Sequence, residues 1–154
     1  MDHIVQKFLL YGCIGILIEF FFTSAGSFLR RRWALTGQSY GWMFPVYGIT
    51  ALALEFISEH LTWPFWLKAF VYVLVIYLTE AFTGIVIKYL TKLLQKWFGG
   101  SGGGVIIWDY GRSWWSPAGL INLKYVFFWY VLALGFGPLS VYLKKIIGFL
   151  ATVQ

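Results

Sequence analysis

The chain has 154 residues, of which 60% are hydrophobic and only 12% are charged. About a quarter of the residues in soluble domains are charged, so this composition excludes an ordinary soluble protein. A bilayer is the remaining solvent, and because one helical span takes about 20 apolar residues, the length allows about five spans at most. The net charge of +6 comes from basic residues beside apolar segments, where such residues set orientation and contact anionic headgroups. We therefore expect membrane lipids, and no nucleic acid, as partners.

The apolar pattern predicts an all-α fold: a polytopic membrane protein with a bundle of four transmembrane helices, forming one integral membrane domain over residues 1–154. The expected spans are residues 8–28, 41–58, 65–90 and 125–143. Pro45 interrupts the start of the second span. Gly135, Gly137 and Pro138 are expected to bend the fourth.

Basic residues are unevenly distributed between the two sides of this bundle. Loops one and three contain Arg30, Arg31, Arg32, Lys88, Lys92, Lys96, Arg112 and Lys124. The opposite side has only Lys7, Lys68, Lys144 and Lys145. The positive-inside rule therefore predicts that loops one and three are cytoplasmic and that both termini lie outside. We expect the bacterial cytoplasmic membrane as the location.

Two carboxylates, Glu19 and Glu80, lie inside otherwise apolar spans. Such a residue is costly in a bilayer and faces a protein interior, a partner or a water-filled cavity. Two interpretations remain open: a polar ligand site, or a neutral glutamate whose hydrogen bonds hold neighbouring helices together. Glu55 and Glu59 lie near a helix end, where we expect solvated positions at the membrane interface.

The residues around the two glutamates resemble each other, since 15–23 is similar to 76–84. The similarity predicts two parallel helix-pair repeats that place Glu19 and Glu80 at equal depth. The glycine-rich run 99–104 has the composition of a flexible linker, either native or engineered. An aromatic and polar segment, 108–123, follows this run and precedes the last span.

A set of short motifs occurs in a specific order along the chain. The set comprises Glu19, Pro-Val-Tyr-Gly at 45–48, Leu-Thr-Glu-Ala-Phe-Thr-Gly at 78–84, Trp-Asp-Tyr at 108–110 and Gly-Leu-Ile-Asn-Leu at 119–123. With these motifs the chain resembles the putative ABC-transporter type IV family, which includes the transmembrane protein 229 group. The resemblance covers about residues 8–140 and implies a permease-like integral membrane protein. It also implies hallmark positions at Glu19, Tyr47, Glu80, Asp109 and Tyr110, among others.

The leading functional hypothesis is a putative transporter with an intramembrane acidic site for a cation, a proton or an amphipathic small molecule. The predicted site residues are Glu19 and Glu80 for negative charge, Asp109 and Arg112 for gating or orientation, Tyr47 and Asn122 for hydrogen bonds, and the hallmark residue Tyr110. One alternative is a membrane scaffold or accessory subunit without transport activity. Another is a membrane-embedded lipid-modifying enzyme with the two carboxylates as acid and base.

Several motifs are absent from this sequence. It contains no GxxxxGK[ST] P-loop and no HExxH motif. His3 and His60 are its two histidines, and both lie outside the expected spans. We therefore expect no catalytic residues, no metal site and no cofactor, and an enzyme is the less favoured class. Transport by so small a bundle would need a homodimer or a partner membrane subunit. The family resemblance implies a separate ATPase as a further partner.

Overall fold

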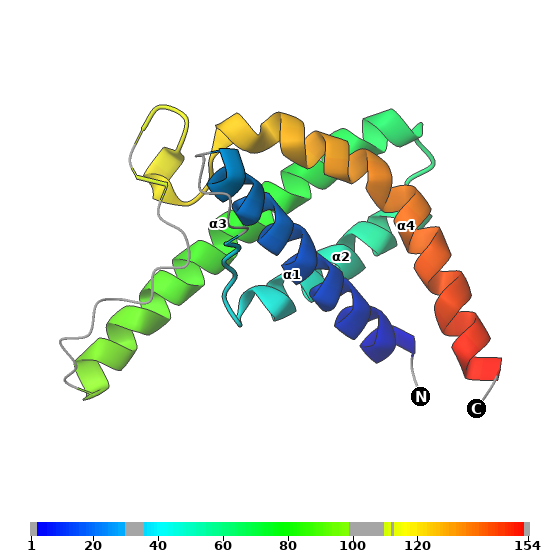
Figure 1. Cartoon of the computed structure of the whole chain (residues 1–154), viewed down its shortest axis with the longest axis horizontal. Coiled ribbons are helices and arrows are strands. Elements are labelled where there is room, and N and C mark those ends of the chain that lie inside the picture. The colour runs from blue at the N-terminus through cyan, green and yellow to red at the C-terminus, as the bar shows by residue number, and fades with distance from the viewer. Residues whose placement is uncertain (1–2, 30–35, 99–109, 112, 153–154) are drawn as a thin grey trace. The chain divides into compact units, whose positions relative to one another are not determined.

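A computed structural model describes residues 3–29, 36–98, 110–111 and 113–152 (Figure 1). The elements are α1 (His3–Leu29), α2 (Met43–His60), α3 (Phe65–Phe98), the 3-10 helices η1 (Pro117–Gly119) and η2 (Leu123–Tyr125), and α4 (Val126–Thr152). The predicted all-α fold is confirmed. All four predicted spans coincide with helices, and α1, α3 and α4 are longer than the apolar runs alone indicated.

Three of these helices are long and apolar enough to cross a membrane. Their membrane-length segments are His3–Ala25, Phe65–Leu93 and Leu123–Phe149. The expected second span coincides with α2, but α2 is not among the three, and its last two turns contain Glu55, Glu59 and His60. The sequence therefore encodes a helical chain with three membrane-length helices, and the four-span bundle remains a prediction.

The chain divides into two compact units, one formed by residues 1–62 with 136–154 and the other by residues 63–135. Three predictions concern the relation between these units: the single domain, the bend in α4 and the parallel repeat. The boundary between the units falls within α4, and Glu19 lies in the first unit whereas Glu80 lies in the second. All three stay predictions. The glycine-rich run 99–104 and the arginines at 30–32 lie outside the described residues.

In the first unit, α1 packs against α2 at glycines, and aromatic rings from the opposite helix lie directly against these glycines. A Cβ atom on Gly12 would come within 2.8 Å of the Phe44 ring, and a Cβ atom on Gly48 would come within 2.6 Å of the Phe8 ring. Both distances are too short for a real side chain, so each glycine allows a close approach of the two helices. The Phe8 and Phe44 rings also meet edge to face, with their centroids 5.7 Å apart.

In the second unit, the described residues between 110 and 125 contact one another and α3. Gly119 has a positive φ of 69°, a conformation that favours glycine, and its carbonyl accepts a hydrogen bond from Tyr110 N–H at 3.4 Å. The next residue, Leu120, packs on Gly84 of α3, where a Cβ atom would lie 2.8 Å from Leu120 Cδ2. At the start of α4, the Tyr130 hydroxyl donates to the Trp66 carbonyl at 3.2 Å. These contacts hold Leu120 and Tyr130 against α3.

Candidate functional site

The carboxylate of Glu19 is the centre of a polar cluster in the first unit. Glu19 is half-buried on α1, inside a membrane-length segment. The Ser39 hydroxyl donates a hydrogen bond to its Oε2 atom at 2.5 Å. The Tyr47 side chain on α2 forms a second hydrogen bond with the same carboxylate. The glutamate is therefore held by two hydroxyl groups that come from outside its own helix.

Local contacts explain how these donors reach Glu19. Thr23 lies one turn after Glu19 on α1, and its Oγ1 atom accepts a hydrogen bond from Gln38 N–H at 2.9 Å. This bond fixes the segment before α2 against the end of α1 and brings the neighbouring Ser39 to the carboxylate. Gly15, one turn before Glu19, leaves room for the Tyr47 side chain, which a Cβ atom at residue 15 would overlap. The site thus depends on a glycine and a threonine one turn on either side of the acid.

The charge on Glu19 is not balanced by a basic side chain in the part of the chain that the structure describes. Every ion pair in those residues involves Glu55 or Glu59 instead. Hydroxyl donors stabilise a carboxylate through hydrogen bonds but carry no positive charge. No described lysine would have to be released before this carboxylate bound a proton or a cation, and the arginines at 30–32 and 112 lie outside the described residues.

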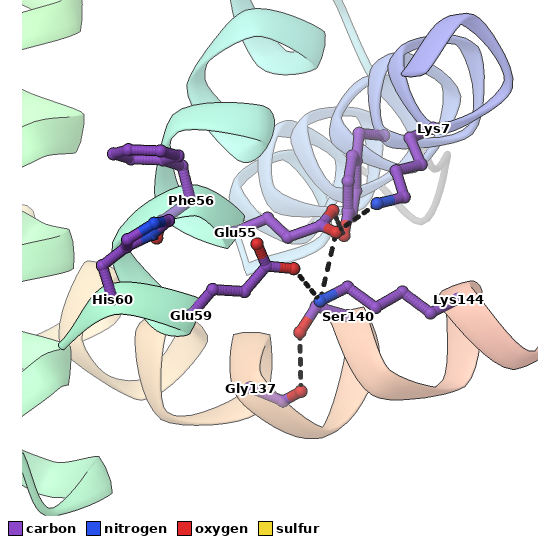
Figure 2. Close-up of polar contacts among 9 residues, drawn as sticks. Lys7, Glu55, Phe56, Glu59, His60, Gly137, Ser140 and Lys144 are labelled. Carbon is purple, nitrogen blue, oxygen red and sulfur yellow. Dashed lines mark hydrogen bonds and ion pairs between the residues drawn. The ribbon is translucent and has the colours of Figure 1, made fainter. Parts of the chain in front are cut away.

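A second polar cluster in the first unit is centred on Glu55 of α2 (Figure 2). Its Oε1 atom lies 2.5 Å from Lys7 Nζ of α1 and 3.2 Å from Lys144 Nζ of α4. The Tyr11 hydroxyl donates to Oε2 at 2.8 Å. Lys144 also pairs with Glu59, at 2.5 Å. The network joins three helices around one carboxylate.

The solvated position expected for Glu55 is wrong, because the residue is only 3% exposed. The Glu59 side chain is 49% exposed, and its position at the membrane interface stays a prediction. Burial raises the pKa of the Glu55 carboxyl, but the hydrogen bonds from Lys7, Tyr11 and Lys144, together with the charge of Lys144, outweigh this effect and hold that pKa below its usual range. Glu55 is therefore an ionised, neutralised carboxylate in a helix that is not one of the three membrane-length helices.

Sequence reasoning missed this network because it treated each charge at a helix end separately. One signal was available. In the predicted topology, Lys7, Glu55 and Lys144 all lie near helix ends on the side of the termini. Opposite charges at the same end of neighbouring helices pair readily, since an unpaired charge would be costly to bury.

In the second unit, Glu80 lies half-buried on α3 with its Oε2 atom enclosed by protein. Tyr77, one turn earlier, is close enough for its hydroxyl to interact electrostatically with Glu80. The same hydroxyl donates to the Asn122 backbone carbonyl at 3.1 Å. The Asn122 side chain accepts a hydrogen bond from Lys124 N–H at 3.1 Å and so caps η2. The side-chain contact of Asn122 is therefore a local one, which stabilises the turn before α4.

The predicted site residues thus fall into separate groups. Glu19 and Tyr47 meet directly in the first unit. Glu80, Tyr110 and Asn122 belong to the second unit, where the Tyr110 ring lies 6.0 Å from that of Tyr125. Asp109 and Arg112 lie outside the described residues. Their assignment to one ligand site stays a prediction.

Comparison with known proteins places this chain in a family. No solved structure matches it. A family model described as putative ABC-transporter type IV matches residues 6–151, which is nearly the whole chain. The match agrees with the three membrane-length helices and confirms the resemblance drawn from the motifs at 45–48, 78–84 and 108–123. The chain belongs to the putative ABC-transporter type IV family.

Proposed function

We propose that this chain is the membrane-embedded part of a transporter and that Glu19 binds a proton or a cation during transport. The family and the three membrane-length helices support a permease-like membrane protein. The observation that carries the assignment of Glu19 is its contrast with Glu55. Both carboxylates accept hydroxyl hydrogen bonds, but Glu55 is neutralised by two lysines, whereas Glu19 has no basic partner among the described residues.

A second acidic position, Glu80, is included in the proposal. Its enclosed Oε2 atom and its place in a membrane-length helix support a role in the same pathway, because acids inside such helices occur on ion and substrate routes. The membrane part needs a source of energy in an ABC-type transporter. Because this sequence has no P-loop, we propose that a separate ATPase subunit supplies it.

The experiment is a binding and flux assay on the purified chain with three probes: protons, rubidium and the lipophilic cation tetraphenylphosphonium. Binding is measured in detergent, which does not require the ATPase, and proton and rubidium leak is measured in proteoliposomes. We expect Glu19→Gln to weaken binding of rubidium or tetraphenylphosphonium by tenfold or more, or to reduce the proton leak, since removing a charged partner from a half-buried site costs more than about 1.4 kcal/mol.

The matched control is Glu59→Gln, which also removes one carboxylate but at a position where the side chain is 49% exposed. It should leave the binding of rubidium and tetraphenylphosphonium and the proton leak unchanged. Circular dichroism must show that both variants remain helical. If Glu19→Gln binds rubidium and tetraphenylphosphonium and leaks protons as the wild type does, Glu19 is not a ligand residue.

A further inference from the structure

Helix α3 is longer than the membrane that it crosses. It has 34 residues and therefore a length of about 51 Å at 1.5 Å per residue, whereas the hydrocarbon core is about 30 Å thick. Its membrane-length segment ends at Leu93, and the helix continues to Phe98. The last turns of α3 therefore lie at or beyond the headgroups on one side of the bilayer.

The exposed face of α3 shows where the hydrocarbon core ends. Exposed apolar side chains recur every three or four residues from Phe70 through Leu74, Leu78 and Phe82 to Ile85. Exposed aromatic residues with a polar atom, Trp66 and Tyr89, stand at the two ends of this row. Trp and Tyr favour the membrane interfaces, and these two residues are about 35 Å apart along the helix. Tyr89 therefore marks one hydrocarbon boundary.

Two exposed lysines occupy the next positions along the helix. Lys88 is adjacent to Tyr89, and Lys92 follows one turn later on the same face as Lys88, about 6 Å further from the core. The headgroup layer is about 5–8 Å thick on each side, so the two ammonium groups lie at the level of the lipid phosphates. Neither lysine is in an ion pair within the described residues.

We propose that Lys88 and Lys92 bind the phosphate of an anionic phospholipid at this end of α3. Two ammonium groups one turn apart complement a phosphodiester, and the apolar row from Ile85 towards Phe70 gives the acyl chains a surface to lie along. A protein partner would have to cover the same apolar row, which lies at the depth of the lipid tails. The positive-inside pattern assigns this end to the cytoplasmic leaflet, which is rich in anionic lipids.

The test is native mass spectrometry of the purified full-length chain titrated with phosphatidylglycerol or phosphatidylcholine, which resolves single lipid-binding events. We expect the wild type to bind the first phosphatidylglycerol more tightly than the first phosphatidylcholine. The double variant K88Q/K92Q should weaken phosphatidylglycerol binding by about fivefold for each lysine lost and leave phosphatidylcholine binding unchanged. K88R/K92R keeps both charges and should retain the preference for phosphatidylglycerol.

The matched control is K124Q/K145Q, which removes two other exposed lysines and the same total charge. It should retain the preference for phosphatidylglycerol. The proposal is overturned if the wild type shows no preference, if K88Q/K92Q keeps it, or if the control loses as much. Millimolar inorganic phosphate is a further arm. If it abolishes the preference, the site binds free phosphate and the assignment to a lipid is wrong.

Discussion

Gly15 on α1 lies directly against the side chain of Tyr47 on α2, where a Cβ atom at residue 15 would overlap Cβ and Cγ of the tyrosine. Tyr47 in turn hydrogen-bonds the carboxylate of Glu19, one helical turn after the glycine. The missing side chain at residue 15 therefore determines how closely α2 approaches α1 at this point. It also determines where the tyrosine hydroxyl meets the proposed ligand-binding acid.

Gly15→Ala is expected to destabilise the protein and to weaken cation binding together. The added methyl group must displace the Tyr47 ring or separate the helices, and overpacking of this kind costs about 1–3 kcal/mol. Displacing the ring also removes a hydrogen bond from Glu19. The free energy of unfolding is measured by titration with SDS, and binding is measured with the same probes as for Glu19→Gln.

Gly135→Ala is the control for this prediction. In the described structure a Cβ atom at residue 135 of α4 meets nothing within 4 Å. Because alanine is the better helix former, this substitution should leave the stability unchanged or raise it by up to about 1 kcal/mol. Equal stability of Gly15→Ala and the wild type would show that the α1 and α2 contact is looser than the structure indicates.

Glu55→Gln is expected to lower the free energy of unfolding by about 2 kcal/mol. The substitution keeps the shape of the side chain but leaves Lys7 and Lys144 facing a neutral group in a buried position. Breaking a fully buried ion pair costs about 3–5 kcal/mol, and the partial exposure of both lysines reduces this cost. SDS titration at neutral pH measures the difference.

Glu59→Gln serves as the comparison, because Glu59 pairs with the same lysine from an exposed position. Losing the ion pair between Glu59 and Lys144 should lower the free energy of unfolding by at most about 1 kcal/mol, as for other surface ion pairs. A larger effect for Glu59→Gln than for Glu55→Gln would mean that the exposed pair, and not the buried one, fixes Lys144.

The contribution of Glu55 to stability should depend on pH. The pKa of this carboxyl is held below its usual range in the folded protein, while the unfolded chain has a value of about 4.3. The stabilisation is therefore fully present above about pH 5 and is lost as the pH falls through the folded-state pKa. The stability difference between the wild type and Glu55→Gln should shrink between pH 7 and pH 3.5. A difference that grows on acidification would contradict this assignment.

The sequence predicted the helices well because its signals are local. Long apolar runs place α1, α3 and α4, and the polar residues around Trp63 and Pro64 separate α2 from α3. Composition does not show whether α2 crosses the membrane. Glu55 and Glu59 make its last turns polar, which fits the interfacial end of a spanning helix and also a helix that does not span. The prediction that Glu19 and Tyr47 act together rested on family motifs, and a direct hydrogen bond joins them in the structure.

The Glu55 network could not be read from local patterns, because Lys7, Glu55 and Lys144 are far apart in the sequence. Whether a carboxylate at a helix end meets water or a lysine depends on which helices are neighbours, and periodicity does not give that information. Asn122 illustrates the same limit. Its residue type fitted a ligand contact and a helix cap equally well, and in the structure its side chain caps η2.

The cap at Asn122 leads to the last prediction, which separates a local structural role from ligand binding. Asn122→Ala removes the acceptor for Lys124 N–H and should lower stability by about 1 kcal/mol. Asn122→Asp keeps an oxygen acceptor at the same place and should preserve stability. Tyr77→Phe removes the hydroxyl that donates to the Asn122 carbonyl and should cost about 1 kcal/mol or less, because the carbonyl keeps its hydrogen bond from Tyr125 N–H. SDS titration measures all three variants. If Asn122→Asp and Asn122→Ala are equally stable but differ in cation binding, the side chain acts on a ligand and not on the start of α4.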